Sequence, residues 1–314
     1  MQNDDTAPVK ILADKIAGSP SHGYLYGDLF HVKSTPSSST TNNIAYTSEP
    51  LAPHQDLAYY ESIPGLQLLH CLEFGNQIVG GESTLIDCMA AAEEFRRISP
   101  HHFRTLLLCP ATFLKQRDGV CMTYLRPHIV LKQNQKINSH ANINNVEDND
   151  FWKGEIVGVN WSPPFEGPLC VPHDMVSPYY AAYSAFEKML DVSLLDTKNE
   201  ILEMNGSNSD FVLQNYAKKY TWKHRLNPGE ILIFNNRRML HGRRGYKIIQ
   251  DFNLESHYPS KENSSDILSR SRHFMGTYTN IDESLNKYRV LLRDRVGHVE
   301  NPFNNVGNGT SIVP

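Results

Sequence analysis

Three residues in this sequence have the types and the spacing to bind a metal ion. His54 and Asp56 stand two positions apart in "PHQDLAYY", and His241 follows a strongly apolar run in "EILIFNNRRMLHGRRGY". In a chain with fourteen histidines, a His-x-Asp triplet arises about once by chance, so the triplet alone more often marks a core strand. Two imidazoles and one carboxylate together suit Fe(II), because they leave three adjacent positions open for a bidentate co-substrate and for O₂.

A 2-oxo acid bound to such a metal carries a second carboxylate at its far end. A buried arginine can bind that carboxylate with two parallel hydrogen bonds. Arg272, in "RHFMGTY", is the candidate, although a surface salt bridge is the commoner role for a single arginine. Arg243 and Arg244 are the alternatives, but they stand two and three positions from His241, at the metal end of the site.

Motifs for several other chemistries are missing from the sequence. It contains no HExxH, Gly-x-Ser-x-Gly, P-loop or GxGxxG pattern. Zinc proteolysis, serine hydrolysis and nucleotide binding therefore lack the residues that they need. The net charge of −4 and the scattered basic residues give no sign of a nucleic-acid footprint, so we expect a small-molecule partner.

The cysteine content and the N-terminus indicate a cytoplasmic protein. The five cysteines are odd in number and form no CxxC pair, which favours a reducing compartment and argues against a structural zinc site. The N-terminal "MQNDDTAPVK" is polar and acidic, unlike a signal peptide, and no stretch approaches 18 apolar residues. We therefore expect a cytoplasmic protein without a membrane partner.

The elements that must position these residues are mostly short strands. The patterns predict a strand from "IAYTS" (44–48), a buried strand "LQLLHCLEF" after a Pro-Gly turn, a helix over about 89–98, a helix that begins at Ser177-Pro178, a strand "EILIF", a loop that delivers His241, and a final strand and amphipathic helix in 272–292. Polar stretches at 34–43, 133–150, 197–210 and 250–270 are predicted loops. This order favours a β-barrel-like or sandwich core with flanking helices.

Four segments in order resemble one known family. "NNIAYTSEPLAPHQDLAYYESIPGLQLLHC", "GGEST", "NPGEILIFNNRRMLHGRRGY" and "RHFMGTY" are similar to the γ-butyrobetaine dioxygenase-like members of the Fe(II)- and 2-oxoglutarate-dependent oxygenases, which also include trimethyllysine dioxygenase and taurine dioxygenase-like enzymes. The similarity runs from about residue 23 to 293. It implies a mainly β fold with flanking helices around a double-stranded β-helix (jelly-roll) core.

The resemblance also assigns the metal and co-substrate residues. It implies that His54, Asp56 and His241 bind Fe(II), and that 2-oxoglutarate and O₂ are consumed, with ascorbate able to serve as reductant. The positions matching the family's 2-oxoglutarate pocket are Asn43, Leu69, Ser83 and Arg272. Without the resemblance, Leu69 and Ser83 would be ordinary core and turn residues.

On the substrate side, the resemblance implies a trimethylammonium group held by aromatic rings. A quaternary cation has no N–H to donate, so ring faces are its best desolvated partners. Tyr26, Phe30, Tyr46 and Tyr278 match this aromatic box, whereas in an unrelated protein four such residues would more often be core. Asn160, in "VNWSPP", matches a residue near the substrate carboxylate. A homodimer is compatible with the resemblance.

The expected reaction is hydroxylation of a trimethylammonium carboxylate, with γ-butyrobetaine, converted to L-carnitine, as the leading substrate. Asn43 and the "HGRRGY" ending resemble the butyrobetaine enzymes more than the trimethyllysine enzymes, which tend to have Asp at the first position. Trimethyllysine hydroxylation is the alternative of the same class. A truncated, inactive betaine-binding protein is the alternative of a different class.

The chain departs from the family pattern at three points. It starts shortly before Tyr26 and lacks the cysteines of the family's N-terminal zinc-binding domain, so we expect 1–314 to be one catalytic oxygenase domain without that domain and without the start of the catalytic domain. His241 and Arg272 are 31 positions apart, more than twice the family's usual gap, so 248–270 must fold away from the pocket. Phe30 and Leu57 stand where Trp and Tyr are usual.

Overall fold

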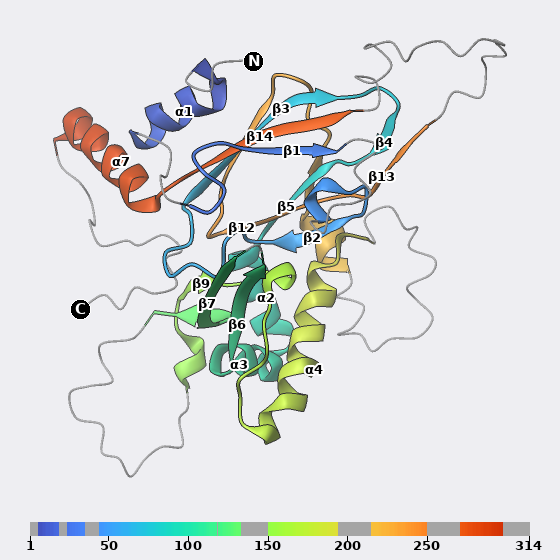
Figure 1. The fold of residues 1–314 in the computed structure, drawn as a ribbon. Coiled ribbons are helices and arrows are strands. Elements are labelled where there is room, and N and C mark those ends of the chain that lie inside the picture. The colour runs from blue at the N-terminus through green and yellow to red at the C-terminus, as the bar shows by residue number, and fades with distance from the viewer. Residues whose placement is uncertain are drawn as a thin grey trace, which may run out of the picture.

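Two four-stranded antiparallel sheets form the centre of the structure. In the computed structural model, residues 6–18, 24–34, 44–117, 119–132, 150–193, 215–249 and 271–297 are described. One sheet has the order β1 (Phe30–Ser34), β14 (Arg272–Thr279), β3 (Leu66–Phe74) and β11 (Ile231–Asn235). The other has the order β10 (Trp222–His224), β5 (Ser83–Asp87), β12 (Met239–Arg243) and β2 (Leu51–His54) (Figure 1). Antiparallel strands in two such sheets are typical of a jelly roll.

Smaller β pairs and helices surround these sheets, and the predicted mainly β class with flanking helices is confirmed. The pairs are β4 (Ile78–Gly80) with β13 (Tyr246–Ile248), β6 (Pro110–Arg117) with β7 (Val120–Pro127), and β8 (Ile129–Leu131) with β9 (Ile156–Val159). The α-helices are α1 (Pro8–Ala17), α2 (Cys88–Ile98), α3 (Pro100–Leu108), α4 (His173–Leu190) and α7 (Ile281–Val296). Single-turn 3₁₀ helices lie at Ile44–Tyr46, Asp150–Lys153 and Pro163–Phe165.

The helices cover different parts of the core (Figure 1). Helices α2, α3 and α4 pack together around a large apolar cluster that includes Phe95, Phe103 and Phe186. Helix α1 packs against β14 and β3, and α7 packs against α1. Within the described residues, no helix combines the length and apolar character that a membrane crossing requires.

The predictions for β3 and α2 are confirmed. Strand β3 lies between β14 and β11 in its sheet, with α1 packed against one face and a second apolar cluster on the other, which explains its nearly continuous apolar sequence. Helix α2 begins after Asp87, whose carboxylate accepts hydrogen bonds from the backbone N–H groups of Met89 and Ala90. The predicted loops at 197–210 and 250–270 lie outside the described residues, as do those at 34–43 and 133–150 except for Ser34, which ends β1, and Asp150, which begins a 3₁₀ helix.

One predicted helix start and one predicted strand are wrong. Helix α4 begins at His173 rather than at Ser177, and Pro178 lies inside it. Pro178 removes one backbone donor, but the helix buries five side chains after this proline, which offsets the loss. Residues Ile44–Tyr46 form a 3₁₀ turn rather than a strand, because their region wraps around the guanidinium of Arg243, which donates to the carbonyls of Ala45, Thr47 and Glu49.

His241 lies on strand β12, so the predicted loop at this position is also wrong. The polar sequence after β11 forms a tight turn, in which Asn235 accepts hydrogen bonds from the backbone N–H groups of Arg237 and Arg238. The chain then returns as β12, between β5 and β2. His241 is thereby placed at a fixed position in the sheet.

Candidate active site

The triplet His54-Gln55-Asp56 is an extended segment, in which successive side chains point to opposite sides of the backbone. His54 and Asp56 point to one side, as residues two apart in an extended chain do. Gln55 points to the other side, where its amide donates to the carbonyl of Val159 and accepts from the backbone N–H of Trp161. The residue between the two polar side chains therefore anchors the segment to the chain beyond β9.

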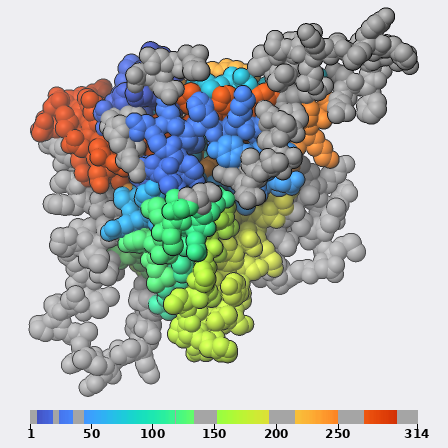
Figure 2. Space-filling view, in the orientation of Figure 1, coloured from blue at the N-terminus to red at the C-terminus, as the bar shows by residue number. Residues whose placement is uncertain are grey.

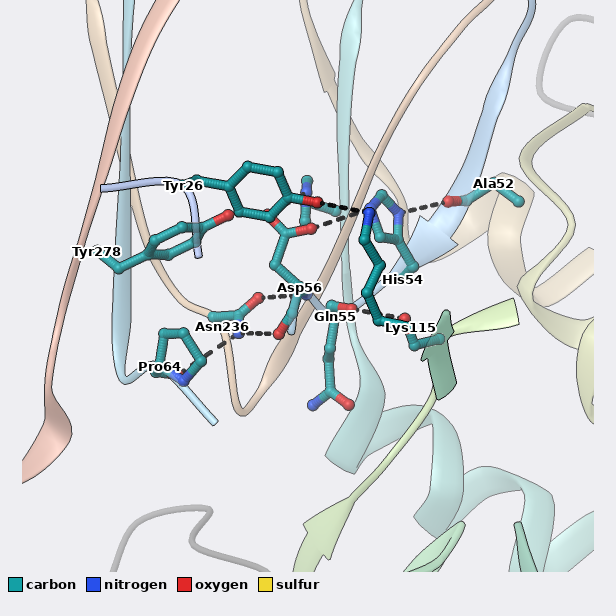
Figure 3. Close-up of polar contacts among 11 residues, drawn as sticks. Tyr26, Ala52, His54, Gln55, Asp56, Pro64, Lys115, Asn236 and Tyr278 are labelled. Atoms are coloured by element: carbon teal, nitrogen blue, oxygen red, sulfur yellow. Dashed lines mark hydrogen bonds and ion pairs between the residues drawn. The ribbon is translucent and has the colours of Figure 1, made fainter. Parts of the chain in front are cut away.

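His54, Asp56 and His241 come together in the fold, and Figure 3 shows the first two of them side by side. His241 is the direct cross-strand partner of His54 in the β12–β2 pair. The Nε2 atoms of His54 and His241 lie 3.4 and 3.6 Å from the two carboxylate oxygens of Asp56. One donor atom from each residue lies within 4.8 Å of the others, which is close enough for a single metal ion.

The surroundings of the three side chains favour their metal-binding forms. His54 has its Nδ1 atom 2.8 Å from the carbonyl of Ala52, which directs Nε2 towards the site. Burial and the nearby imidazole of His54 lower the pKa of His241 to about 3, so His241 is neutral at pH 7. Burial opposes the ionisation of Asp56, but His241, His54 and a 2.7 Å hydrogen bond from Tyr278 hold its pKa below the usual range. The donor set thus fits Fe(II).

Asn236 fixes the backbone of Asp56. Its side-chain oxygen accepts from the backbone N–H of Asp56, and its NH₂ group donates to the carbonyls of Asp56 and Pro64. Asn236 is fully buried. Leu57, the residue after Asp56, has a left-handed φ of 58°, which is rare for a non-glycine residue. The turn that carries the carboxylate is therefore held by one amide 180 positions away.

Replacing Asn236 tests this contact. Asn236→Ala leaves the buried N–H of Asp56 without its acceptor, and we expect the free energy of unfolding to fall by about 2–3 kcal/mol. Asn227→Ala, which removes one exposed side-chain hydrogen bond to Glu230, should cost less than about 1 kcal/mol. Urea denaturation measures both. Equal losses in the two variants would show that Asn236 does not support the carboxylate turn.

A cavity of about 470 Å³ opens beside the three residues, and Arg272 lines it. Arg272 is 5% exposed and stacks on Phe274, with its guanidinium carbon 4.1 Å from the ring centroid. Burial, followed by the like charge of Arg243, lowers its pKa to about 9, so it stays charged at pH 7. Among the described residues it forms no ion pair, and such a buried cation favours an anionic ligand.

The two competing arginines have other partners. Arg243 lines the same cavity, but its guanidinium donates to three backbone carbonyls of the 44–50 segment. Arg244 donates to the carbonyl of Val192 and lines a second cavity, not the one that contains His54, Asp56 and His241. Residues 250–270 lie outside the described residues, yet Arg272 itself reaches the cavity from β14. The geometry thus favours Arg272 for a co-substrate carboxylate.

The four aromatic residues of the expected box all line the cavity. The rings of Phe30 and Tyr278 stack with centroids 5.0 Å apart, and Tyr26 lies 6.4 Å from Phe30. Phe30 rests on Gly276, where an added Cβ would lie 2.3 Å from the ring. Burial, mainly, raises the pKa of Tyr278, so its hydroxyl stays protonated and donates to Asp56.

The remaining expected residues are divided between the cavity and other places. Leu69 on β3 and Ser83 on β5 line the cavity. Asn43 lies outside the described residues. Asn160 does not belong to the cavity lining: it is buried, and its side chain donates to the carbonyl of Pro127.

The sequence interpretation missed several polar residues at this site. Gln67, on β3, lines the cavity with a buried side-chain oxygen that accepts no hydrogen bond from the described part of the chain. Arg117 lines it from β6, and Lys115, two residues earlier, donates to the hydroxyl of Tyr26 over 3.4 Å (Figure 3). A polar residue within an apolar strand pattern was the available signal in "LQLLHC" and "ATFLKQR".

The fold and the three donor residues define the class of metal site used by non-haem Fe(II) oxygenases. The family model described as "Taurine catabolism dioxygenase TauD, TfdA family" matches residues 16–253. The chain therefore belongs to this family.

Individual relatives are similar over most of this chain. Gamma-butyrobetaine dioxygenase of Homo sapiens is 28% identical over 276 residues, which are 87% of this chain and 55% of the relative. Trimethyllysine dioxygenase, mitochondrial, of Gallus gallus is 25% identical over 76% of this chain and 46% of the relative. The solved structure of PvcB, an Fe, alpha-ketoglutarate dependent oxygenase from an isonitrile synthetic pathway, aligns with a TM-score of 0.47 and 12% identity over 90% of this chain and 73% of that one. The chain spans about half the length of the curated relatives that it matches.

Proposed function

We propose that this protein is an Fe(II)- and 2-oxoglutarate-dependent dioxygenase that hydroxylates a small molecule. The observation that carries the proposal is that one cavity contains both the three metal-binding side chains and the buried guanidinium of Arg272, which forms no ion pair with the residues that the structure describes. A metal alone would not need this cation, and a structural ion would not need the open cavity. A chelating 2-oxo acid with a second carboxylate uses both features.

The chain's own residues position the reactants. His54, Asp56 and His241 would hold Fe(II), and Arg272 would bind the far carboxylate of 2-oxoglutarate. When bound, the metal and co-substrate supply the oxidising power, with O₂ consumed and succinate and CO₂ released. Asn236 and Tyr278 keep the Asp56 carboxylate in place through hydrogen bonds. The aromatic wall excludes water and limits how the substrate can lie, so positioning is the protein's main contribution.

For the substrate, we propose a trimethylammonium carboxylate, with γ-butyrobetaine, hydroxylated to L-carnitine, ahead of trimethyllysine. The names of the relatives and the aromatic lining of the cavity support this choice. Ring faces stabilise a quaternary ammonium by about 0.5–2 kcal/mol each. A cytoplasmic location and a homodimer remain predictions from the sequence.

Succinate release tests the oxygenase proposal. The full chain with Fe(II), 2-oxoglutarate and ascorbate should release succinate faster with γ-butyrobetaine than with trimethyllysine or without substrate. Mass spectrometry should show one added oxygen in the product. A folded, metal-loaded chain that binds betaines but releases no succinate with any of them would instead be an inactive binding protein.

A further inference from the structure

The proposed substrate has a carboxylate, and its expected partner lies elsewhere. Asn160 donates its side-chain hydrogen bond to the carbonyl of Pro127 and does not line the cavity. Arg272 is suited to the co-substrate, and Arg243 donates to backbone carbonyls. A second anionic group in the cavity therefore needs another cation.

Strand β6 supplies cations at the substrate side of the cavity. Alternate residues of β6 point inwards, and this row begins with Ala111 and Phe113, which are buried. It continues with Lys115, which is 6% exposed, and Arg117, which lines the cavity. Lys115 is not itself among the residues that line the cavity, but its ammonium donates to the hydroxyl of Tyr26, which lines it, so the Lys115 charge lies directly behind this part of the wall.

Lys115 lies at the edge of Tyr26 and leaves the ring face accessible. Its Nζ atom is 3.4 Å from the hydroxyl oxygen but 5.7 Å from the ring centroid, so the ammonium lies beyond the hydroxyl end of the ring. Figure 3 shows the side chain extending from β6 to this hydroxyl. On the face drawn in Figure 2, blue residues from the N-terminal part of the chain lie against green residues from its middle part.

The charges lining the cavity agree with an anionic group at this end. Among the described lining residues, Asp56 is the one acid, and it belongs to the metal site, whereas Arg117, Arg243 and Arg272 are cations. When Fe(II) and 2-oxoglutarate are bound, the charges of the metal, the co-substrate, Asp56 and Arg272 sum to zero. The β6 cations then face the substrate. A quaternary ammonium next to them would be repelled at low dielectric, and a carboxylate would be attracted.

We propose that Lys115 and Arg117 bind the carboxylate of the substrate. This inference rests on the proposed function and adds an orientation to it. The carboxylate points to β6, the trimethylammonium group lies against ring faces away from Lys115, and Tyr26 marks the border between the two ends. Lys115 and Arg117 thereby determine specificity for an acid over a neutral or cationic analogue.

Binding of three matched ligands tests the proposal. γ-Butyrobetaine carries both charges, its methyl ester keeps only the cation, and 5,5-dimethylhexanoate keeps only the carboxylate. Calorimetry under anaerobic conditions, with Fe(II) and 2-oxoglutarate bound, should show that the ester binds the parent at least about tenfold more weakly than γ-butyrobetaine, because it loses a charge-assisted hydrogen bond. Equal affinity for acid and ester would overturn the proposal without any variant.

The variants assign the effect to β6. Lys115→Met should weaken both acids about tenfold or more and leave the ester unchanged. Arg117→Gln, at a less buried position, should act in the same direction and provides the test if Lys115→Met does not fold. Lys33→Met is the control, because Lys33 is exposed on the outer face of β1. Unchanged binding of the acids, or an equal loss for acid and ester, in Lys115→Met and Arg117→Gln would overturn the proposal.

The experiments distinguish failure of the oxygenase proposal from failure of the proposed carboxylate site on β6. Turnover is measured as succinate, whereas the β6 site is measured as the difference in ligand affinity between parent and variants, in the metal-free chain as well. Selective weakening of acid binding without any succinate would support the β6 site and reject the oxygenase. Succinate release without this selectivity would do the reverse.

Discussion

Asp56→Ala should abolish succinate release, lowering it more than about 100-fold, and should remove specific binding of a divalent metal. The carboxylate is one of three ligands, and removing even an outer partner of a metal ligand costs about 10–100-fold. Asp56→Asn should behave similarly, because the amide keeps the shape but loses the charge that holds the cation. Calorimetric titration with Co(II) and a succinate assay measure both effects.

A control separates metal binding from folding. Asp294→Ala removes a carboxylate on the exposed side of α7 and should change neither measurement. Addition of metal should raise the unfolding temperature of the parent and of this control, but not of Asp56→Ala, because a ligand stabilises only the form that binds it. Near-normal succinate release by Asp56→Ala would mean that the three residues are not the metal site.

Arg272→Lys should raise the KM for 2-oxoglutarate at least about tenfold, with a smaller change in the KM for the substrate. A lysine ammonium keeps the charge, but it cannot form the two parallel hydrogen bonds of a guanidinium. It also loses the stacking on Phe274. Steady-state kinetics with each reactant varied in turn separates the two KM values.

Arg244→Lys is the matched control for this experiment. Arg244 donates to the carbonyl of Val192 and lines the second cavity, so its replacement should leave the KM for 2-oxoglutarate unchanged. If Arg244→Lys raised that KM and Arg272→Lys did not, the co-substrate would bind at the other arginine and the proposed orientation of the cavity would be wrong.

Local sequence patterns predicted the elements whose environment is regular. Strand β3 and helix α2 follow from a continuous apolar run and from a capped amphipathic segment. The 3₁₀ turn at Ile44–Tyr46 was not predictable in this way, because it depends on Arg243, about 200 positions later. The strand position of His241 depends on pairing with β5 and β2, which the polar turn before it does not reveal.

The same distinction applies to the site. His54, Asp56, His241 and Arg272 could be selected because their chemistry restricts them to few residue types. Asn236 could not, since an asparagine in a turn is common, and its partner Asp56 is far away in the sequence. Lys115 was missed because a lysine in a hairpin strand is usually exposed, and only the burial of β6 shows that it points inwards.

The direct pairing of His54 with His241 has a consequence for how the sheet opens. Strand β2 is four residues long and lies at the edge of its sheet, where a short strand can detach at low cost. A metal ion bound by His54 on β2 and His241 on β12 would link the two strands. Detachment of β2 from β12 would then require release of the ion. The free energy of metal binding is thus added to the local cost of opening, and a one-residue slip of β2 would turn His54 to the opposite face.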